Sequence, residues 1–214
     1  MPVQKPERAM SSDPAVSKVW MAGRCRRQQR VVRCRLAVCV LAAFASGCDD
    51  PRLTQSREIA AEFQQDLGGR LMSALSSGGP VEAISVCKIA APQISGDLSN
   101  NTGALVARTA LKVRNPDNKP DAAARAVLEE FAADIDAGAT EPPEQFERRA
   151  DGSARYMKAI IMQPMCLACH GKELAPAVQA AITESYPQDE ATGFAAGDLR
   201  GAFIIEWPSD GHAP

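Results

Sequence analysis

The sequence predicts an α+β fold, in which helices pack beside an antiparallel sheet. Stretches with apolar residues at helical spacing are mixed with short β-branched stretches, and turn residues separate them. The 214-residue chain is 45% apolar and 23% charged, as is usual for a globular protein. Aromatic residues make up only 5% of the chain, so we expect a core built mostly of Ala, Val, Leu and Ile.

Charge is distributed unevenly along the chain. Residues 1–47 hold 9 Lys and Arg against 2 Asp and Glu, whereas residues 48–214 hold 15 against 24. Nucleic-acid binding needs a basic surface, so the acidic body argues against a nucleic-acid partner. An acidic surface instead suits a basic protein partner.

The amino-terminal segment has the pattern of a secretory signal peptide. Arginines crowd residues 24–35, an apolar stretch follows at residues 36–44, and small residues occupy 45–47. The apolar stretch is too short to cross a bilayer, which takes about 20 residues. We therefore expect residues 1–47 to be a signal peptide, with Met21 as an alternative start, and the rest of the chain to be exported.

Two kinds of cleavage fit this segment. Ordinary cleavage near Gly47 would release a soluble periplasmic protein. Residues 45–48 also resemble a lipobox, although Ala45 stands where leucine is usual, and Cys48 would then carry the lipid anchor. The aspartates at 49–50 resemble a signal for retention at the inner membrane. We favour the lipoprotein interpretation, which places the protein on the periplasmic face of that membrane.

The body begins with two predicted helices. After a short linker at residues 48–54, a domain is expected over residues 55–207. Apolar residues four apart predict a helix over 57–75. The Ser-Ser-Gly-Gly-Pro segment at 76–80 ends this helix and begins a second one, which we expect Pro92 to end.

The remaining elements alternate between strands and helices. Residues 104–114 have the β-branched content of a strand, 115–120 must form a loop, and Asp121 caps a helix that extends to 137. The elements expected after it are a hairpin of residues 146–149 and 154–162, a helix at 173–185, a closing strand at 201–207 and a flexible tail at 208–214.

Residues 166–170 read Cys-Leu-Ala-Cys-His, which is the attachment sequence of c-type haem. Two thiols one helical turn apart add to the haem vinyl groups, and the adjacent histidine becomes the proximal iron ligand. Such attachment takes place after export, so the motif and the signal peptide agree. We expect one covalent haem c, held by Cys166 and Cys169, with His170 on the iron.

Other interpretations of the cysteine pair give a different protein. Cys166 and Cys169 could form a disulfide in an oxidising compartment or a thiol redox pair. A zinc site would need a second pair of this kind, which is missing. Without haem, the chain would be an exported α+β binding or structural domain.

The residues alone leave the second axial ligand open. No methionine follows His170, so the usual downstream Met of small cytochromes c is absent. The candidates are Met72, Met157, Met162, Met165, His212, Cys87 or an open site. Free cysteine is often buried, so spacing alone favours a packing role for Cys87.

Arginines of the predicted strand 104–114 are candidate partners for haem propionates. Arg108, Lys112 and Arg114 have even spacing and would share one face of that strand. Arginine pairs bidentately with carboxylates, so Arg108 and Arg114 fit the role, with Arg114 preferred. The alternative is a solvated basic face whose ion pairs contribute little.

Three blocks of the sequence are similar to a known family. They are residues 108–118, residues 165–171, and residues 186–202 with a short gap at 195–196. Over residues 55–207 the chain resembles a family of exported single-haem c-type proteins, a domain of unknown function that also serves as the sensor of histidine kinases. The resemblance implies a PAS-like fold with an antiparallel sheet flanked by helices, a covalent haem c and a cysteine as distal iron ligand. Cys87 occupies the matching position.

A haem protein of this kind has two natural roles. With both axial sites filled, the haem can only pass electrons. If a thiolate ligand leaves, the protein can sense redox state or a diatomic gas and signal to a partner. An enzyme is less expected, because a peroxidase needs a distal base and the only histidines are His170 and His212. We expect an electron carrier or sensor with a redox or signalling partner.

Overall fold

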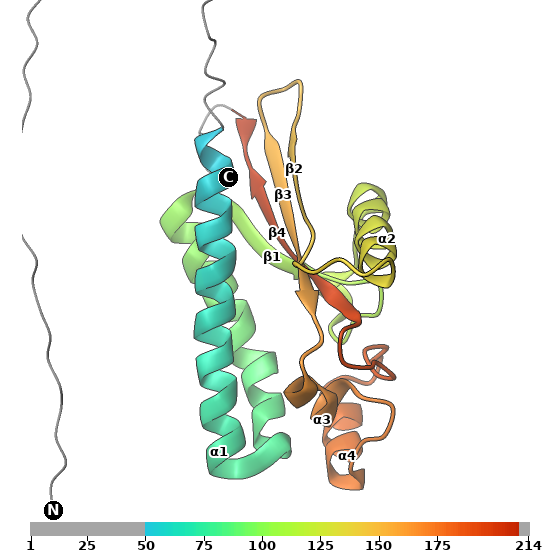
Figure 1. The fold of residues 1–214 in the computed structure, drawn as a ribbon. Helices are drawn as coiled ribbons and strands as arrows, with labels where there is room; N and C mark the ends of the chain where they lie inside the picture. Colours follow the sequence, from blue (N-terminus) through green and yellow to red (C-terminus); the bar gives the residue numbers. More distant parts are fainter. Residues whose placement is uncertain (1–49, 210–214) are drawn as a thin grey trace, which may run out of the picture. The chain divides into compact units, whose positions relative to one another are not determined.

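A four-stranded antiparallel sheet forms the centre of the structure, a computed structural model that describes residues 50–209. The strands lie in the order β1-β4-β3-β2. They are β1 (Leu105–Thr109), β2 (Glu144–Arg148), β3 (Ala154–Ile161) and β4 (Leu199–Trp207). Figure 1 shows α1 along one face of the sheet and α2 on the other. The predicted α+β fold is therefore confirmed.

The helix α1 (Pro51–Thr102) is a pair of helical arms joined at Gly79. Gly79 has a φ of 72° and a ψ of −167°, a backbone conformation that glycine adopts readily and that interrupts the helix. Pro80 then opens the second arm, where a missing N–H matters least. The two arms lie side by side in Figure 1 and contribute to one core cluster. The predicted pair of helices is present.

Both arms are longer than the sequence predicts. The first arm begins at Pro51, so residues 51–54 are helical and not a linker. The Asp50 side chain accepts a hydrogen bond from the Arg52 N–H at 3.0 Å, which caps this end. The second arm continues through Pro92 to Thr102, contrary to expectation. Ile94 and Leu98 are buried against the sheet, and this packing outweighs the hydrogen bond that proline removes.

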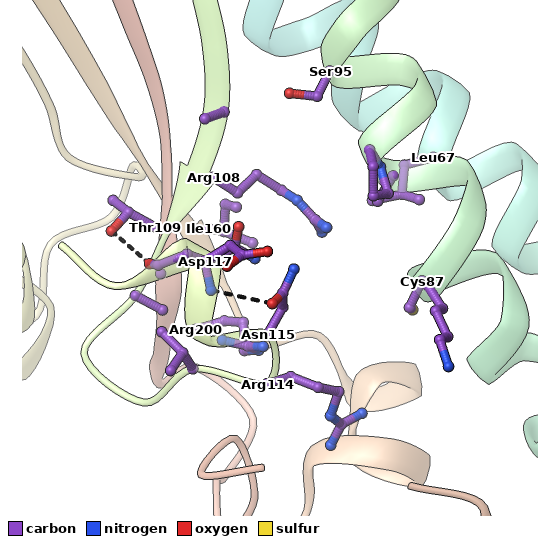
Figure 2. A pocket seen from close by; sticks show the side chains of 18 of the residues that line it. Leu67, Cys87, Ser95, Arg108, Thr109, Arg114, Asn115, Asp117, Ile160 and Arg200 are labelled. Carbon is purple, nitrogen blue, oxygen red and sulfur yellow. Dashed lines mark hydrogen bonds between the residues drawn. The ribbon is translucent and has the colours of Figure 1, made fainter. Parts of the chain in front are cut away.

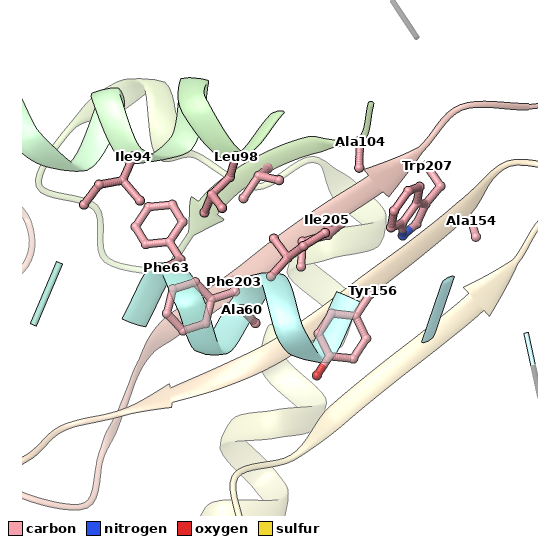
Figure 3. Packing of buried hydrophobic residues seen from close by; sticks show 12 residues of the cluster. Ala60, Phe63, Ile94, Leu98, Ala104, Ala154, Tyr156, Phe203, Ile205 and Trp207 are labelled. Atoms are coloured by element: carbon pink, nitrogen blue, oxygen red, sulfur yellow. The ribbon is translucent and has the colours of Figure 1, made fainter. Parts of the chain in front are cut away.

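The core between α1 and the sheet gathers much of the chain's aromatic content. Phe63 from the first arm packs with Phe203 of β4 at 5.4 Å between ring centroids (Figure 3). Trp207 donates a buried hydrogen bond from Nε1 to the Ser56 Oγ at 2.8 Å. Elsewhere the core is mostly aliphatic, as expected, but aromatic rings hold this helix to the sheet.

The opposite face of the sheet is covered by α2 (Ala122–Asp136). As predicted, Asp121 caps this helix, accepting from the Ala124 N–H at 2.6 Å. The same carboxylate binds Arg155 of β3 at 2.6 Å, and Arg155 also pairs with Glu206 of β4. The ion pairs therefore tie the start of α2 to the central strands.

The first strand ends earlier than the sequence predicts. Pairing between β1 and β4 stops at Thr109, which faces Ala202, so residues 110–115 form an irregular connection before η1 (Pro116–Asn118). Lys112 and Arg114 therefore do not share a strand face with Arg108. The predicted hairpin of β2 and β3 is present, with β2 starting at Glu144 and β4 starting at Leu199. The last helix, α4 (Pro176–Ser185), begins at its proline and not at residue 173.

Candidate functional site

A cavity of about 920 Å³ lies between the two arms of α1, the sheet and the Cys-Leu-Ala-Cys-His segment. Aliphatic side chains from α1 line one wall, and basic side chains project from the sheet side (Figure 2). The aliphatic residues include Leu67, Leu71, Leu75, Ala83 and Ile84. The predicted site residues that the structure describes all line this cavity, namely Cys87, Arg108, Arg114, Cys166, Cys169 and His170. Cys48 and His212 lie outside the described residues.

The Cys-Leu-Ala-Cys-His motif occupies two consecutive short turns, η2 (Pro164–Cys166) and α3 (Leu167–His170). Gly171 ends the motif by donating to the Leu167 carbonyl at 2.9 Å, and a Cβ on Gly171 would lie 2.5 Å from that oxygen. Cys166 and Cys169 are half-buried free thiols, not joined to each other. Burial raises the pKa of the Cys169 thiol. One wall of the cavity thus presents two sulfur atoms and an imidazole.

A hydrogen bond fixes the His170 ring. Its Nδ1 lies 2.7 Å from the carbonyl oxygen of Ala191, which can only accept, so Nδ1 carries the proton. Burial, together with the charges of Arg200, Arg114 and Arg108, lowers the pKa of His170 to about 2. A neutral imidazole protonated at Nδ1 leaves Nε2 with a free lone pair, the form that binds a metal ion.

Arg114 holds the motif in place. Its guanidinium pairs with Asp189 at 3.1 Å, and both side chains are over nine-tenths buried. It also donates to the carbonyls of Cys169 at 2.6 Å and Ala191 at 3.3 Å. Because Ala191 also accepts from His170, Arg114 connects the second cysteine, the histidine and the segment after α4 in one network. Its Nε and Nη2 donors are directed at the protein itself.

Arg108 and Arg200 differ from Arg114 in having no carboxylate partner among residues 50–209. Each guanidinium lies over an aromatic ring, Arg108 at 5.4 Å from the centroid of Phe63 and Arg200 at 5.6 Å from that of Phe194. Burial lowers the pKa of Arg108, and burial with the charges of Arg114 and Arg108 lowers that of Arg200 to about 10.

Arg200 was not among the predicted site residues. It occurs in the Gly-Asp-Leu-Arg-Gly-Ala block that carries part of the family resemblance. Membership of that block is the sequence feature that could have indicated a role for Arg200. Its position could not be inferred without knowing that β4 lies beside β1. Gly201 follows it, and a Cβ there would lie 2.4 Å from the Thr109 carbonyl oxygen, so only glycine permits this close approach of the strands.

Cys87 comes from the second arm of α1 and lies across the cavity from the arginines (Figure 2). It is a half-buried free thiol. A charge on Cys87 would influence the ionisation of Arg108, Cys169 and Tyr186, which indicates that it lies near them. The helical hairpin of α1 therefore brings this cysteine opposite the motif.

The methionines considered as the second iron ligand do not face the motif in the way that Cys87 does. Met157 is buried in the core under α2, and Met72 is 49% exposed on α1 and does not line the cavity. Met162 and Met165 do line the cavity, but both belong to the segment that leads into Cys166. Among the described residues, Cys87 is thus the sulfur that faces the motif from a separate element.

Comparisons with known proteins identify the family of the chain. Within residues 50–209, no helix is both long and apolar enough to cross a bilayer. The family model described as Tll0287-like matches residues 25–208. Comparison with the curated proteins found no match.

A solved structure gives a second comparison. The chain is similar to the crystal structure described as the cyanobacterial heme-protein Tll0287, with 26% identity and a TM-score of 0.59 over 75% of this chain and 96% of that chain. Both matches confirm the family resemblance found in the sequence. Because the family model covers most of its length, the chain belongs to the Tll0287-like family.

Proposed function

We propose that the protein carries one covalent haem c in the cavity and works in electron transfer. The observation that carries this proposal is that one cavity of about 920 Å³ brings the Cys-Leu-Ala-Cys-His motif together with Cys87 and with two arginines, Arg108 and Arg200, that have no carboxylate partner within residues 50–209. An apolar wall suits a porphyrin ring, and basic side chains suit its two carboxylates. The family relation to a protein described as a heme-protein supports the same cofactor.

The motif supplies the groups that would hold this cofactor. Cys166 and Cys169 offer free thiols for the two thioether bonds, which release nothing, since each S–H adds across a vinyl group. His170 would bind the iron through Nε2, because Nδ1 donates to Ala191. The bound iron supplies a single chemical capacity, the reversible uptake of one electron.

Cys87 is the group we assign to the opposite side of the iron. Its sulfur lines the cavity from the second arm of α1, whereas Met162 and Met165 belong to the motif's own side. A thiolate ligand donates negative charge and favours the oxidised iron, so we expect a low midpoint potential. If His170 and Cys87 both bound the iron, the protein would leave no position on it for a substrate.

Sensing is a second candidate, favoured by one feature of the fold. Cys87 is carried by a helical arm that follows the non-helical Gly79, while His170 is held by hydrogen bonds to the segment after α4. Loss of Cys87 as a ligand on reduction or gas binding would therefore release one arm and leave the motif in place. Such a change could be passed to a signalling partner.

We also propose that the protein is exported and anchored by lipid at Cys48. The basic and apolar pattern before Cys48 supports export, and covalent haem attachment takes place after export. Palmitate labelling of the wild-type protein and of Cys48→Ser tests the anchor. Wild-type protein without label would contradict the anchor and leave soluble periplasmic export as the alternative, and label that persists in the variant would show that a residue other than Cys48 carries the lipid.

A pyridine haemochrome spectrum of the matured protein tests the cofactor. Thioether-bonded haem gives a different absorption maximum from haem with intact vinyl groups, and it stays with the chain on a denaturing gel. We expect both signatures in the wild type and neither in Cys166→Ala/Cys169→Ala. Met165→Leu, next to the motif, is the matched control and should keep both. Colourless wild-type protein from cells with haem-attachment machinery would contradict the proposal.

A further inference from the structure

We propose that Arg108 and Arg200 together form a carboxylate-binding site, which takes the two propionate groups of the porphyrin. This inference rests on the proposed haem and assigns its polar contacts. It replaces the expected pair of Arg108 and Arg114.

The two arginines come from neighbouring strands and reach the same space. Arg108 lies on β1 and Arg200 near the start of β4, and these strands pair directly. Both side chains line the cavity, and Figure 2 shows Arg108 extending into it from the sheet side, where Arg200 also lies. Two cations so placed repel each other unless an anion lies between them.

Each guanidinium keeps N–H groups that are available to donate hydrogen bonds to a ligand. An aromatic ring covers one face, Phe63 for Arg108 and Phe194 for Arg200. A cation–π contact of this kind does not replace the hydrogen bonds that the N–H groups can donate. Arg200 uses one donor on the carbonyl of Lys112 at 3.2 Å. The remaining edges match the planar oxygens of a carboxylate, which accepts two parallel hydrogen bonds.

The charge balance of the cavity points to an anionic ligand. The ionisable side chains that line it, apart from cysteine, tyrosine and histidine, are Lys88, Arg108, Arg114, Arg200 and the exposed Asp117. Burial lowers the pKa of both Arg108 and Arg200, which reflects the energetic cost of their unpaired charges. Two carboxylates from a bound ligand would supply the missing counter-charge.

Arg114 and Lys88 lack these properties. Arg114 is already paired with Asp189 and donates to the Cys169 carbonyl, so its Nε and Nη2 donors are occupied and its charge has a buried partner. Lys88 is exposed and has a flexible stem, so a contact through it would be screened by water. Lys88 therefore serves as the control for a basic residue that lines the cavity without belonging to the site.

The test uses the full chain with Cys166→Ser and Cys169→Ser, in which haem binds reversibly. Haemin and haemin dimethyl ester have the same ring, but the ester lacks both carboxylate charges. We expect this parent to bind haemin at least about tenfold more tightly than the ester, since hydrogen bonds to charged groups contribute roughly 1.5–3 kcal/mol. Titrations followed by absorbance give both affinities.

Substitutions then locate the contacts. Arg108→Gln and Arg200→Gln, each added to the parent, should weaken haemin binding about tenfold and leave ester binding within about twofold. Lys88→Gln should change neither. Equal affinity of the parent for haemin and ester would overturn the carboxylate site alone, as would arginine variants that weaken both compounds equally. A parent that binds neither compound would contradict the haem proposal as well.

Discussion

Arg114 donates a hydrogen bond to the carbonyl oxygen of Cys169 at 2.6 Å, across 55 positions of sequence. The same guanidinium pairs with Asp189, whose carboxylate in turn accepts from the Ala191 N–H at 2.9 Å. The motif thus depends on a buried ion pair that lies outside it. The Arg114–Asp189 ion pair helps to set the position of the second cysteine and the histidine.

Asp189→Asn should destabilise the protein strongly. The change leaves the buried charge of Arg114 without its partner, and breaking one side of a buried pair typically lowers the free energy of unfolding by about 3–5 kcal/mol. Asp66→Asn is the control, because Asp66 forms an exposed pair with Arg70 one helical turn away and should lose less than about 0.5 kcal/mol. Urea unfolding measures both. Equal losses in the two variants would refute the structural role of the Arg114–Asp189 ion pair.

Cys87→Ser should raise the midpoint potential of the haem-loaded protein and allow the reduced protein to bind CO. A hydroxyl is a weaker ligand than a thiolate and carries no negative charge, so the oxidised iron loses stabilisation. Met162→Leu, on the motif's side of the cavity, is the matched control and should keep the wild-type behaviour. Redox titration and the CO spectrum are the measurements. A wild-type potential and spectrum in Cys87→Ser would show that another group binds the iron.

Gly201→Ala should disrupt the sheet at the edge of the cavity. The added Cβ would lie 2.4 Å from the Thr109 carbonyl oxygen and 2.9 Å from the Ala110 Cβ, so β1 and β4 would have to separate. We expect a loss of roughly 1–3 kcal/mol in unfolding free energy. Gly68→Ala, in the first arm of α1 with nothing within 4 Å, should instead be neutral or stabilising by up to about 1 kcal/mol. Thermal unfolding distinguishes the two, and a harmless Gly201→Ala would contradict the close approach.

Asp121 should contribute to the acid sensitivity of the fold. Its ion pair with Arg155 lowers the pKa of this carboxyl to about 2 from the usual 3.8. The folded state therefore binds this proton less readily than the unfolded state, so the contribution is present above pH 4 and is lost as pH falls toward 2. Asp121 is 57% exposed, so we expect less than about 1 kcal/mol.

Asp121→Asn isolates this effect, because asparagine still caps α2. The unfolding free energy of the variant should fall less steeply than that of the wild type between pH 4 and pH 2. The two proteins should converge at the acid end of this interval. Parallel curves would contradict the contribution of the ion pair.

Local patterns predicted the elements whose causes are local. The Ser-Ser-Gly-Gly-Pro segment indicated the break in α1, and the structure places the non-helical residue at Gly79. Asp121 was identified as a cap from its residue type and position. The expectation that Pro92 ends the helix was wrong. It considered only the local hydrogen bond that proline removes, whereas Ile94 and Leu98 are buried on the sheet. Tertiary packing determined that helix.

The site was predictable in parts. The motif identified Cys166, Cys169 and His170 from spacing, but their partners come from distant segments. Arg108 and Arg114 were grouped because residues at even spacing share one face of a strand. This holds only within a strand, and β1 ends at Thr109, before Arg114. Arg114 consequently points to Asp189, while Arg200 takes a place beside Arg108 in the cavity because β4 pairs with β1.

Trp207 gives the molecule a built-in optical reporter. The chain has 2 tryptophans, Trp20 and Trp207, and the indole of Trp207 bonds to Ser56 where the first helical arm meets the sheet. In a Trp20→Phe background, its emission would follow the undocking of that arm, whereas far-ultraviolet circular dichroism would follow total helix content. Comparison of the two signals during unfolding would reveal whether the two arms of α1 separate from the sheet before their helical structure is lost.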